Sequence, residues 1–160
     1  MVKSLHHRLG SAVGAGALAG LAAGIIMGIA MHAQGMMTDV ARIVGTENLL
    51  AGWVYHLFNS AVIGALFGLI LGRGALNYRQ GLLRGGLYGV GWWILGGLIL
   101  MPLMLGMPAF APLRMAEMHG VALFSLVGHI IFGVLLGAGY AYLHVTSPFA
   151  KRREAPTTTK

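Results

Sequence analysis

The chain has no cysteine and few charged residues, and both absences narrow its class. Without cysteine it can form no disulfide, no iron–sulfur cluster and no thiolate metal site. Charged residues make up only 9% of its 160 residues, whereas hydrophobic residues make up 57% and the mean hydropathy is +0.76. A soluble domain carries about 25% charged residues. Because so few ionic side chains cannot cover a water-facing surface, the composition predicts a membrane protein with one compact domain.

Acidic and basic residues are missing from four long apolar stretches, at about 11–34, 49–72, 85–107 and 121–143. Each is long enough to cross a hydrocarbon core, which needs about 20 apolar residues in a helix. Unpaired backbone groups are not tolerated in lipid, so we expect all four spans to be helical. The sequence therefore predicts an all-α fold: a four-transmembrane-helix bundle over 1–148, with a basic and polar cytoplasmic tail at 149–160.

Basic residues are distributed unequally between the two ends of these spans. Nine of the eleven lie in the N-terminal segment, in the connection between the second and third spans, and in the C-terminal tail; only Arg42 and Arg114 lie in the opposite loops. The positive-inside rule then places both termini in the cytoplasm of a multi-pass protein, which we assign to a bacterial inner membrane. This placement attributes the net charge of +7 to topology and lipid contact rather than to nucleic acid.

Small residues recur at every fourth position of each span. The four rows contain Gly16, Gly20, Gly24 and Gly28; His56, Ser60, Gly64, Gly68 and Gly72; Gly85, Gly89, Trp93 and Gly97; and Ser125, His129, Gly133, Gly137 and Ala141. Small residues at this spacing let helices approach closely in a membrane, so we expect Gly-rich packing of the spans against one another. The second and fourth rows are similar, which indicates an internal duplication of a two-helix unit.

Three histidines belong to these rows or extend them: His32, His56 and His129. All three fall in the outer half of the predicted bundle, and we expect them to point inward. An ionisable residue inside a membrane is by default a functional-site hypothesis. We therefore predict these three side chains as cofactor ligands, with haem b or a metal ion as the cofactor. Interhelical hydrogen bonds and a proton relay are the alternatives, although the spans contain no carboxylate for a relay.

The methionines favour one side of the predicted membrane. The nine after Met1 all lie in the outer half of the spans or in the outer loops: Met27, Met31, Met36, Met37, Met101, Met104, Met107, Met115 and Met118. Thioether and imidazole groups suit Cu(I), and His and Met also serve as axial haem ligands. The predicted metal ligands are Met31, Met101, Met104 and His119. Adaptable apolar packing is the alternative, but it does not explain the loop residues Met36, Met37, Met115 and Met118.

Nothing in the sequence supports an enzyme active site. The carboxylates of Asp39, Glu47 and Glu117 are too few and too exposed to propose as an acid/base pair. Ser60 and Ser125 lie inside spans that hold no acidic residue to orient a histidine, so a hydrolase triad is unsupported. We therefore predict a protein that is not an enzyme.

Four short stretches carry a family resemblance: LAGWVYHLF at 50–58, LRGGLYGV at 83–90, MPLM at 101–104 and GHIIFG at 128–133. With them, about 20–142 of the chain resembles a family of small four-helix bacterial inner-membrane proteins of unknown function. The resemblance implies a membrane location and a four-helix fold. It supplies no activity and no ligand residues.

These patterns together predict an accessory subunit with a periplasmic-side His/Met site for haem or copper. We expect it to lie in the lipid bilayer as a homo-oligomer or as part of a larger membrane complex. A purely structural or assembly subunit is the first alternative. A small transporter or channel is the second, although the absence of charge within the spans weakens it.

Overall fold

The computed structural model describes the backbone of residues 2–71 and 77–146 and the side chains of residues 10–71 and 77–143. Across these ranges the chain is helical and forms no strand. Four helices are long and apolar enough to span a membrane: Gly10–Ala33, Leu49–Leu71, Tyr78–Met104 and Ala116–Leu143. The prediction of an all-α protein with four membrane-type helices is confirmed. The tail expected at 149–160 lies outside the described residues.

Long helices alternate with short ones along the chain. The elements are α1 Val2–Ala33, α2 Met37–Ile43, α3 Leu49–Leu71, α4 Tyr78–Trp92, the π-helix η1 Trp93–Leu100, α5 Met101–Met104, α6 Ala111–Arg114, the 3-10 helix η2 Ala116–Met118, and α7 His119–Thr146. The third membrane helix begins at Tyr78 rather than at residue 85, because it continues through Arg79 and Arg84 beyond the apolar run. Asn77 caps it: the side-chain oxygen accepts a hydrogen bond from the Gln80 backbone N–H at 2.9 Å.

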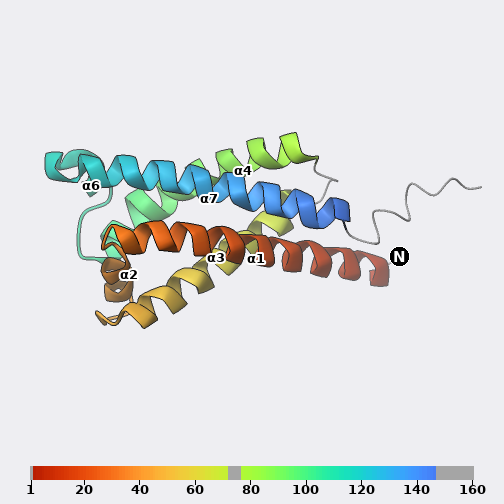
Figure 1. Ribbon diagram of the computed structural model, residues 1–160, viewed down its shortest axis with the longest axis horizontal. Coiled ribbons are helices and arrows are strands. Elements are labelled where there is room, and N and C mark those ends of the chain that lie inside the picture. The colour runs from red at the N-terminus through yellow and green to blue at the C-terminus, as the bar shows by residue number, and fades with distance from the viewer. Residues whose placement is uncertain (1, 72–76, 147–160) are drawn as a thin grey trace, which may run out of the picture.

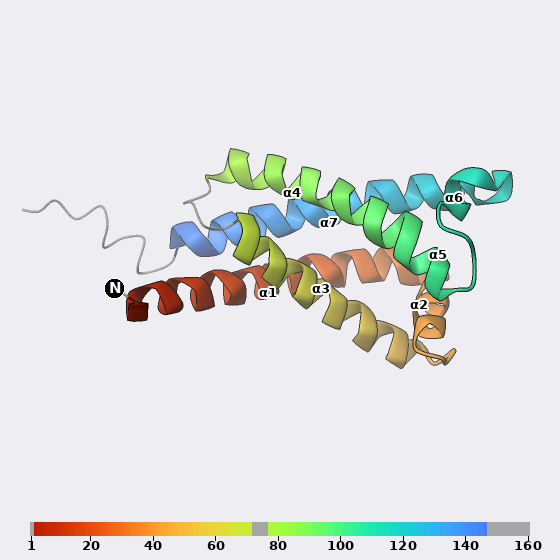
Figure 2. The ribbon, with the colours of Figure 1, turned by 180° about the vertical axis from the view of Figure 1, so that it is seen from behind.

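The long helices form two antiparallel pairs, α1 with α3 and α4 with α7 (Figure 1). The pairs join mainly through α1 and α7, which run side by side through the middle of the molecule in both views (Figure 2). By contrast, α3 and α4 touch only sparsely. We call the end that carries α2 and α6 the loop end, and the opposite end, where α1 begins, the terminal end.

Glycine lets each pair of helices approach until backbone meets backbone. A Cβ built on Gly16 of α1 would collide with the carbonyl oxygen of Gly64 on α3, and one built on Gly64 would collide with that of Gly16. Between α4 and α7 the same reciprocal relation links Gly85 with Gly133. These seams contain the described glycines of the four-residue rows; Gly72 lies outside the described residues.

The two pairs repeat one design at a constant offset along the chain. Gly85 lies 69 residues after Gly16 (85 − 16), and Gly133 lies 69 residues after Gly64 (133 − 64). The offset links both helices of the first pair to both helices of the second, in the same antiparallel register. The structure therefore carries the duplication that the sequence pattern indicated, as two αα-hairpins related by this register.

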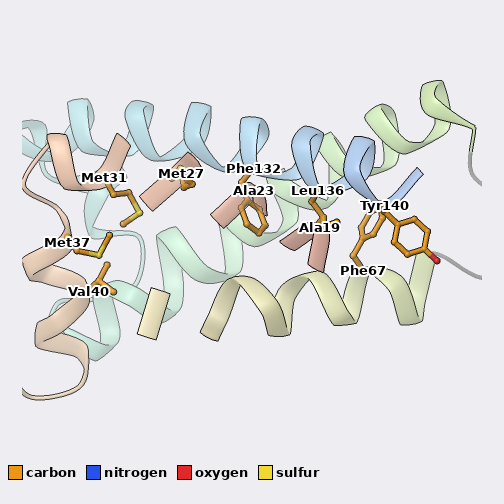
Figure 3. Close-up of a cluster of buried hydrophobic side chains, with 10 residues drawn as sticks. All are labelled: Ala19, Ala23, Met27, Met31, Met37, Val40, Phe67, Phe132, Leu136 and Tyr140. Atoms are coloured by element: carbon orange, nitrogen blue, oxygen red, sulfur yellow. The ribbon is translucent and has the colours of Figure 1, made fainter. Parts of the chain in front are cut away.

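The buried core changes character along the bundle (Figure 3). Towards the terminal end, Phe67 of α3 packs edge to face against Tyr88, at 5.3 Å between ring centroids, and against Tyr140, at 5.5 Å. Towards the loop end, methionines replace the rings. Met27, Met31 and Met37 line up there with Val40.

The third membrane helix changes geometry just before Pro102. It runs as a π-helix over Trp93–Leu100 and then continues through α5. Pro102 has no N–H to donate to the carbonyl of Leu98, four residues earlier. The Phe110 backbone N–H donates to that carbonyl instead, at 2.7 Å. The returning loop is thereby fixed against the widened helix.

Candidate functional site

Two of the predicted histidines lie within the bundle, each bonded to a backbone carbonyl. His56 Nε2 donates to the carbonyl oxygen of Gly24 at 2.9 Å, across the α1–α3 seam. His129 Nδ1 donates to the carbonyl oxygen of Ser125 at 2.7 Å, one turn back on α7. A carbonyl only accepts, so these two nitrogens carry the protons. Both side chains are half-buried.

The third histidine differs from these two. His32, near the end of α1, is exposed, so the expectation that it points inward is wrong. A straight helix rotates about 40° for each step of four residues, and this drift carries the row away from the seam by its last member. The indole of Trp53 lies between the rings, 6.1 Å from that of His32 and 6.3 Å from that of His56.

The structure does not gather the three histidines around one point. Within the described ranges, no three His, Asp or Glu side chains form a group that could hold a metal ion. His56 belongs to the seam of the first hairpin, and His129 to the second. The alternative of interhelical hydrogen bonding therefore describes His56, whereas the bond of His129 stays within α7.

A pocket of about 420 Å³ opens at the loop end, between α2, η1, α5 and the start of α7. Four methionines contribute to its wall: Met36, Met101, Met107 and Met118. They come from four segments: the turn before α2, α5 itself, the loop that follows α5, and η2. We call this space the methionine pocket.

The other predicted metal ligands lie elsewhere. Met31 is buried in the hydrophobic core, and Met104 is 52% exposed. His119 is exposed, with Nε2 at 3.3 Å from the carbonyl oxygen of Leu113. Of the four, only Met101 lines the methionine pocket.

Sequence reasoning did not select Met107 or group it with Met36 and Met118. The one-sided distribution of the methionines was the signal for all three residues. Which of them share a wall depends on the path of the loops.

Charged residues of α2 stand at the mouth of this pocket. Arg42 forms ion pairs with Asp39, at 3.1 Å, and with Glu47, at 2.9 Å. The hydrogen bond that Arg42 donates to Glu47, together with the negative charge of that carboxylate, raises the pKa of Arg42, so the guanidinium keeps its charge at any ordinary pH. Asp39 and Arg42 both line the pocket, so the charge of this carboxylate is compensated there, whereas Glu47 is not part of the lining. Because all three groups are exposed, the ion pairs themselves contribute little stability.

The floor of the methionine pocket is formed by Gly97 and Ser125. A Cβ built on Gly97 would stand 3.0 Å from Ser125 Oγ and 3.2 Å from Trp93 Cδ1, so only glycine leaves this corner unfilled. The indole Nε1 of Trp93 is buried and has no hydrogen-bond partner among the described residues. An unpaired buried donor costs about 1–3 kcal/mol. Gly97 and Ser125 thus line the pocket next to Trp93, which is not itself part of the lining.

Comparisons with protein-family models, with curated proteins and with solved structures found no match for the chain. The family resemblance therefore stays an expectation. What stands is the coarser description of a small protein with four membrane-type helices.

Proposed function

We propose that this chain is a non-enzymatic, multi-pass protein of a bacterial inner membrane and that it holds Cu(I) in its methionine pocket, as an accessory subunit of a larger assembly. In the orientation given by the basic residues, both termini lie in the cytoplasm and the pocket opens on the periplasmic side. The observation that carries the proposal is that four methionines from four different segments line one partly open space.

Unfilled volume distinguishes these methionines from packing residues. Methionine is flexible and normally serves a core by filling irregular gaps. Met27 and Met31 do this, because both are buried within the hydrophobic cluster. The pocket methionines instead border about 420 Å³ that no side chain occupies.

The chemistry of the wall suits a soft cation of low charge. Thioether sulfur prefers Cu(I), whereas hard ions such as Mg²⁺ and Ca²⁺ prefer oxygen. Asp39 is the one carboxylate that lines the pocket, and Arg42 neutralises it. This donor set favours copper and gives hard divalent ions little to bind.

Copper is better supported than haem by the positions of the histidines. An axial haem ligand must present a ring nitrogen to iron in a space wide enough for the macrocycle. His56 lies in a seam so narrow that a Cβ on Gly28 would stand 3.1 Å from its Cδ2. Haem binding there would require the first hairpin to open.

The test is a Cu(I) titration of the protein purified in mild detergent, under anaerobic reducing conditions, against a chromophoric Cu(I) chelator. We expect one tightly held Cu(I) per chain. The triple variant Met36→Leu, Met101→Leu, Met118→Leu keeps volume and apolarity but removes three sulfurs, and should lower affinity more than about 100-fold. Even the outer-shell partners of a metal are worth about 10–100-fold.

Met104→Leu is the matched control, because Met104 lies on the same short helix as Met101 but faces outward. It should bind copper as the parent does. Equal affinity of the triple variant and the parent would contradict the proposal. A Soret band with stoichiometric iron would show that the cofactor is haem rather than copper.

A self-associating bundle held by its glycine rows has less support. Gly16, Gly64, Gly85 and Gly133 are buried, and each meets a backbone group of its own chain. These glycines leave no room on their faces for a second copy. An accessory role would instead place partner contacts on the outer faces of the helices.

A further inference from the structure

A second open space lies between α3 and α4. It is about 510 Å³ in volume, and its walls are apolar except at one end, where Arg84 lies. Leu66 and Ile70 contribute from α3, Gly91 from α4, and Leu95 from η1, which continues α4. We call it the α3–α4 groove.

The internal repeat indicates that this groove is a specific departure from close packing. Under the offset of 69 residues, α1 corresponds to α4 and α3 to α7, so the α1–α7 contact corresponds to the contact between α4 and α3. In the closed contact Ala19 lies against Gly139, with 3.3 Å between the Ala19 Cβ and a Cβ built on the glycine. Ala19 corresponds to Tyr88 (19 + 69), and Gly139 corresponds to Ile70 (139 − 69). Both equivalents are much larger residues.

Tyr88 holds the two walls at a fixed separation. Its hydroxyl donates to the carbonyl oxygen of Ile63 on α3 at 2.8 Å, and its ring packs against Phe67 and Trp92. The Tyr88 side chain thus keeps α3 and α4 apart at this level. Opposite the bulky walls, Gly91 leaves open space, since a Cβ built there meets nothing within 4 Å.

The length of the groove matches one leaflet of a bilayer. From Arg84 to Leu95 a helix rises roughly 16 Å at 1.5 Å per residue, about half of a hydrocarbon core of roughly 30 Å. Arg84 lies at the terminal end, close to where the basic residues of the chain gather. Among the residues that the structure describes, its Nη1 makes one long hydrogen bond of 3.4 Å, to the carbonyl oxygen of Leu71. A guanidinium has five N–H donors, so others remain for a phosphate.

We propose that the α3–α4 groove binds one acyl chain of an anionic phospholipid, with the lipid phosphate held by Arg84. The apolar walls take the chain, and the single cation at headgroup depth selects the charge. This site is separate from the methionine pocket and does not depend on copper binding.

The experiment measures lipid retention by the delipidated, detergent-purified full chain with native mass spectrometry. The probes are palmitoyl-oleoyl phosphatidylglycerol and the zwitterionic phosphatidylcholine with the same chains. We expect one phosphatidylglycerol retained about tenfold more tightly than phosphatidylcholine. Arg84→Gln should remove that preference. Arg79 lies on the same helix but outside the groove. Arg79→Gln removes the same charge and should leave most of the preference for phosphatidylglycerol.

The groove itself is tested by Gly91→Leu, which should displace both lipids by filling the space. Gly14→Leu is its control, because Gly14 is also exposed on a membrane helix with nothing within 4 Å. Equal losses in the two arginine variants would overturn the proposal in favour of general surface attraction. Unchanged retention in Gly91→Leu would also overturn it, as would a dimer that occupies the groove in place of lipid.

Discussion

The two ends of this bundle are built differently although both hairpins share one register. The terminal end closes around aromatic rings and glycine seams, with Phe67 and Tyr140 fully buried. The loop end carries methionines, a π-helix and a pocket of about 420 Å³. Close packing therefore dominates the terminal end. At the loop end, residues with sulfur donor atoms line an open pocket. The difference separates the rings and glycine seams that hold the fold from the methionine pocket that we propose binds copper.

The largest expected effect comes from the glycine seam. Gly64→Ala places a Cβ against the carbonyl of Gly16, and Gly133→Ala does the same against that of Gly85. Because backbone must move on both sides, each should cost more than about 4 kcal/mol. That corresponds to at least about 8 °C in unfolding temperature for a chain of this size. Gly14→Ala, with open space around it, should be neutral or stabilising. If Gly64→Ala and Gly14→Ala unfolded at the same temperature, close packing at the glycine seam would not be what stabilises the bundle.

A smaller loss is expected from the aromatic core. Phe67→Ala removes a ring with 0% exposure that contacts Tyr88 and Tyr140. The cavity should cost about 3 kcal/mol, measured by thermal or denaturant unfolding in detergent. Phe58→Ala on the same helix is the control, because Phe58 is 63% exposed and leaves no cavity. Similar losses in both variants would show that hydrophobicity, rather than packing, sets the stability of this end.

The inward histidine of the first hairpin should contribute less again. His56→Leu removes the bond to the Gly24 carbonyl, and interhelical bonds in membranes are worth about 0.6 kcal/mol on average. His32→Leu removes an exposed ring that donates no such bond among the described contacts, and should leave the unfolding temperature unchanged. If His56→Leu unfolds the protein outright, His56 has a role beyond this hydrogen bond.

The smallest effect is expected at the mouth of the methionine pocket. Arg42→Gln breaks the ion pairs to Asp39 and Glu47, all of which are exposed to solvent. Screening makes such pairs nearly neutral for stability, so the unfolding temperature should not move at ordinary salt. Because the variant leaves two carboxylates uncompensated, Cu(I) should bind at least as tightly. Weaker copper binding would show that Arg42 positions the pocket.

Much of the fold could be predicted because lipid imposes simple rules on sequence. Four uncharged apolar runs gave four membrane-type helices, and the four-residue rows coincide with the α1–α3 and α4–α7 seams. The start of the third helix was misplaced because Arg79 and Arg84 extend it past the apolar run. The π-helix was not predicted, since it depends on Pro102 and on the loop that returns to Leu98.

The candidate site was harder to predict than the fold. The side of the membrane on which methionines gather is visible in the sequence, but the rotation of each one about its helix is not. Met101 and Met104 are three residues apart, less than one helical turn, yet one lines the pocket and the other is exposed. His32 left the seam through the steady rotation of a four-residue row, and Trp53 lies between its ring and that of His56.

The most direct test of the central claim is X-ray absorption at the copper edge, recorded on the protein loaded with one equivalent of Cu(I). We expect sulfur scatterers in the first coordination shell of the parent and of Met104→Leu. In the Met36→Leu, Met101→Leu, Met118→Leu variant the sulfur contribution should fall to at most that of the remaining Met107. A shell of nitrogen and oxygen alone in the parent, or copper that washes off during purification, would contradict a thioether site in the methionine pocket.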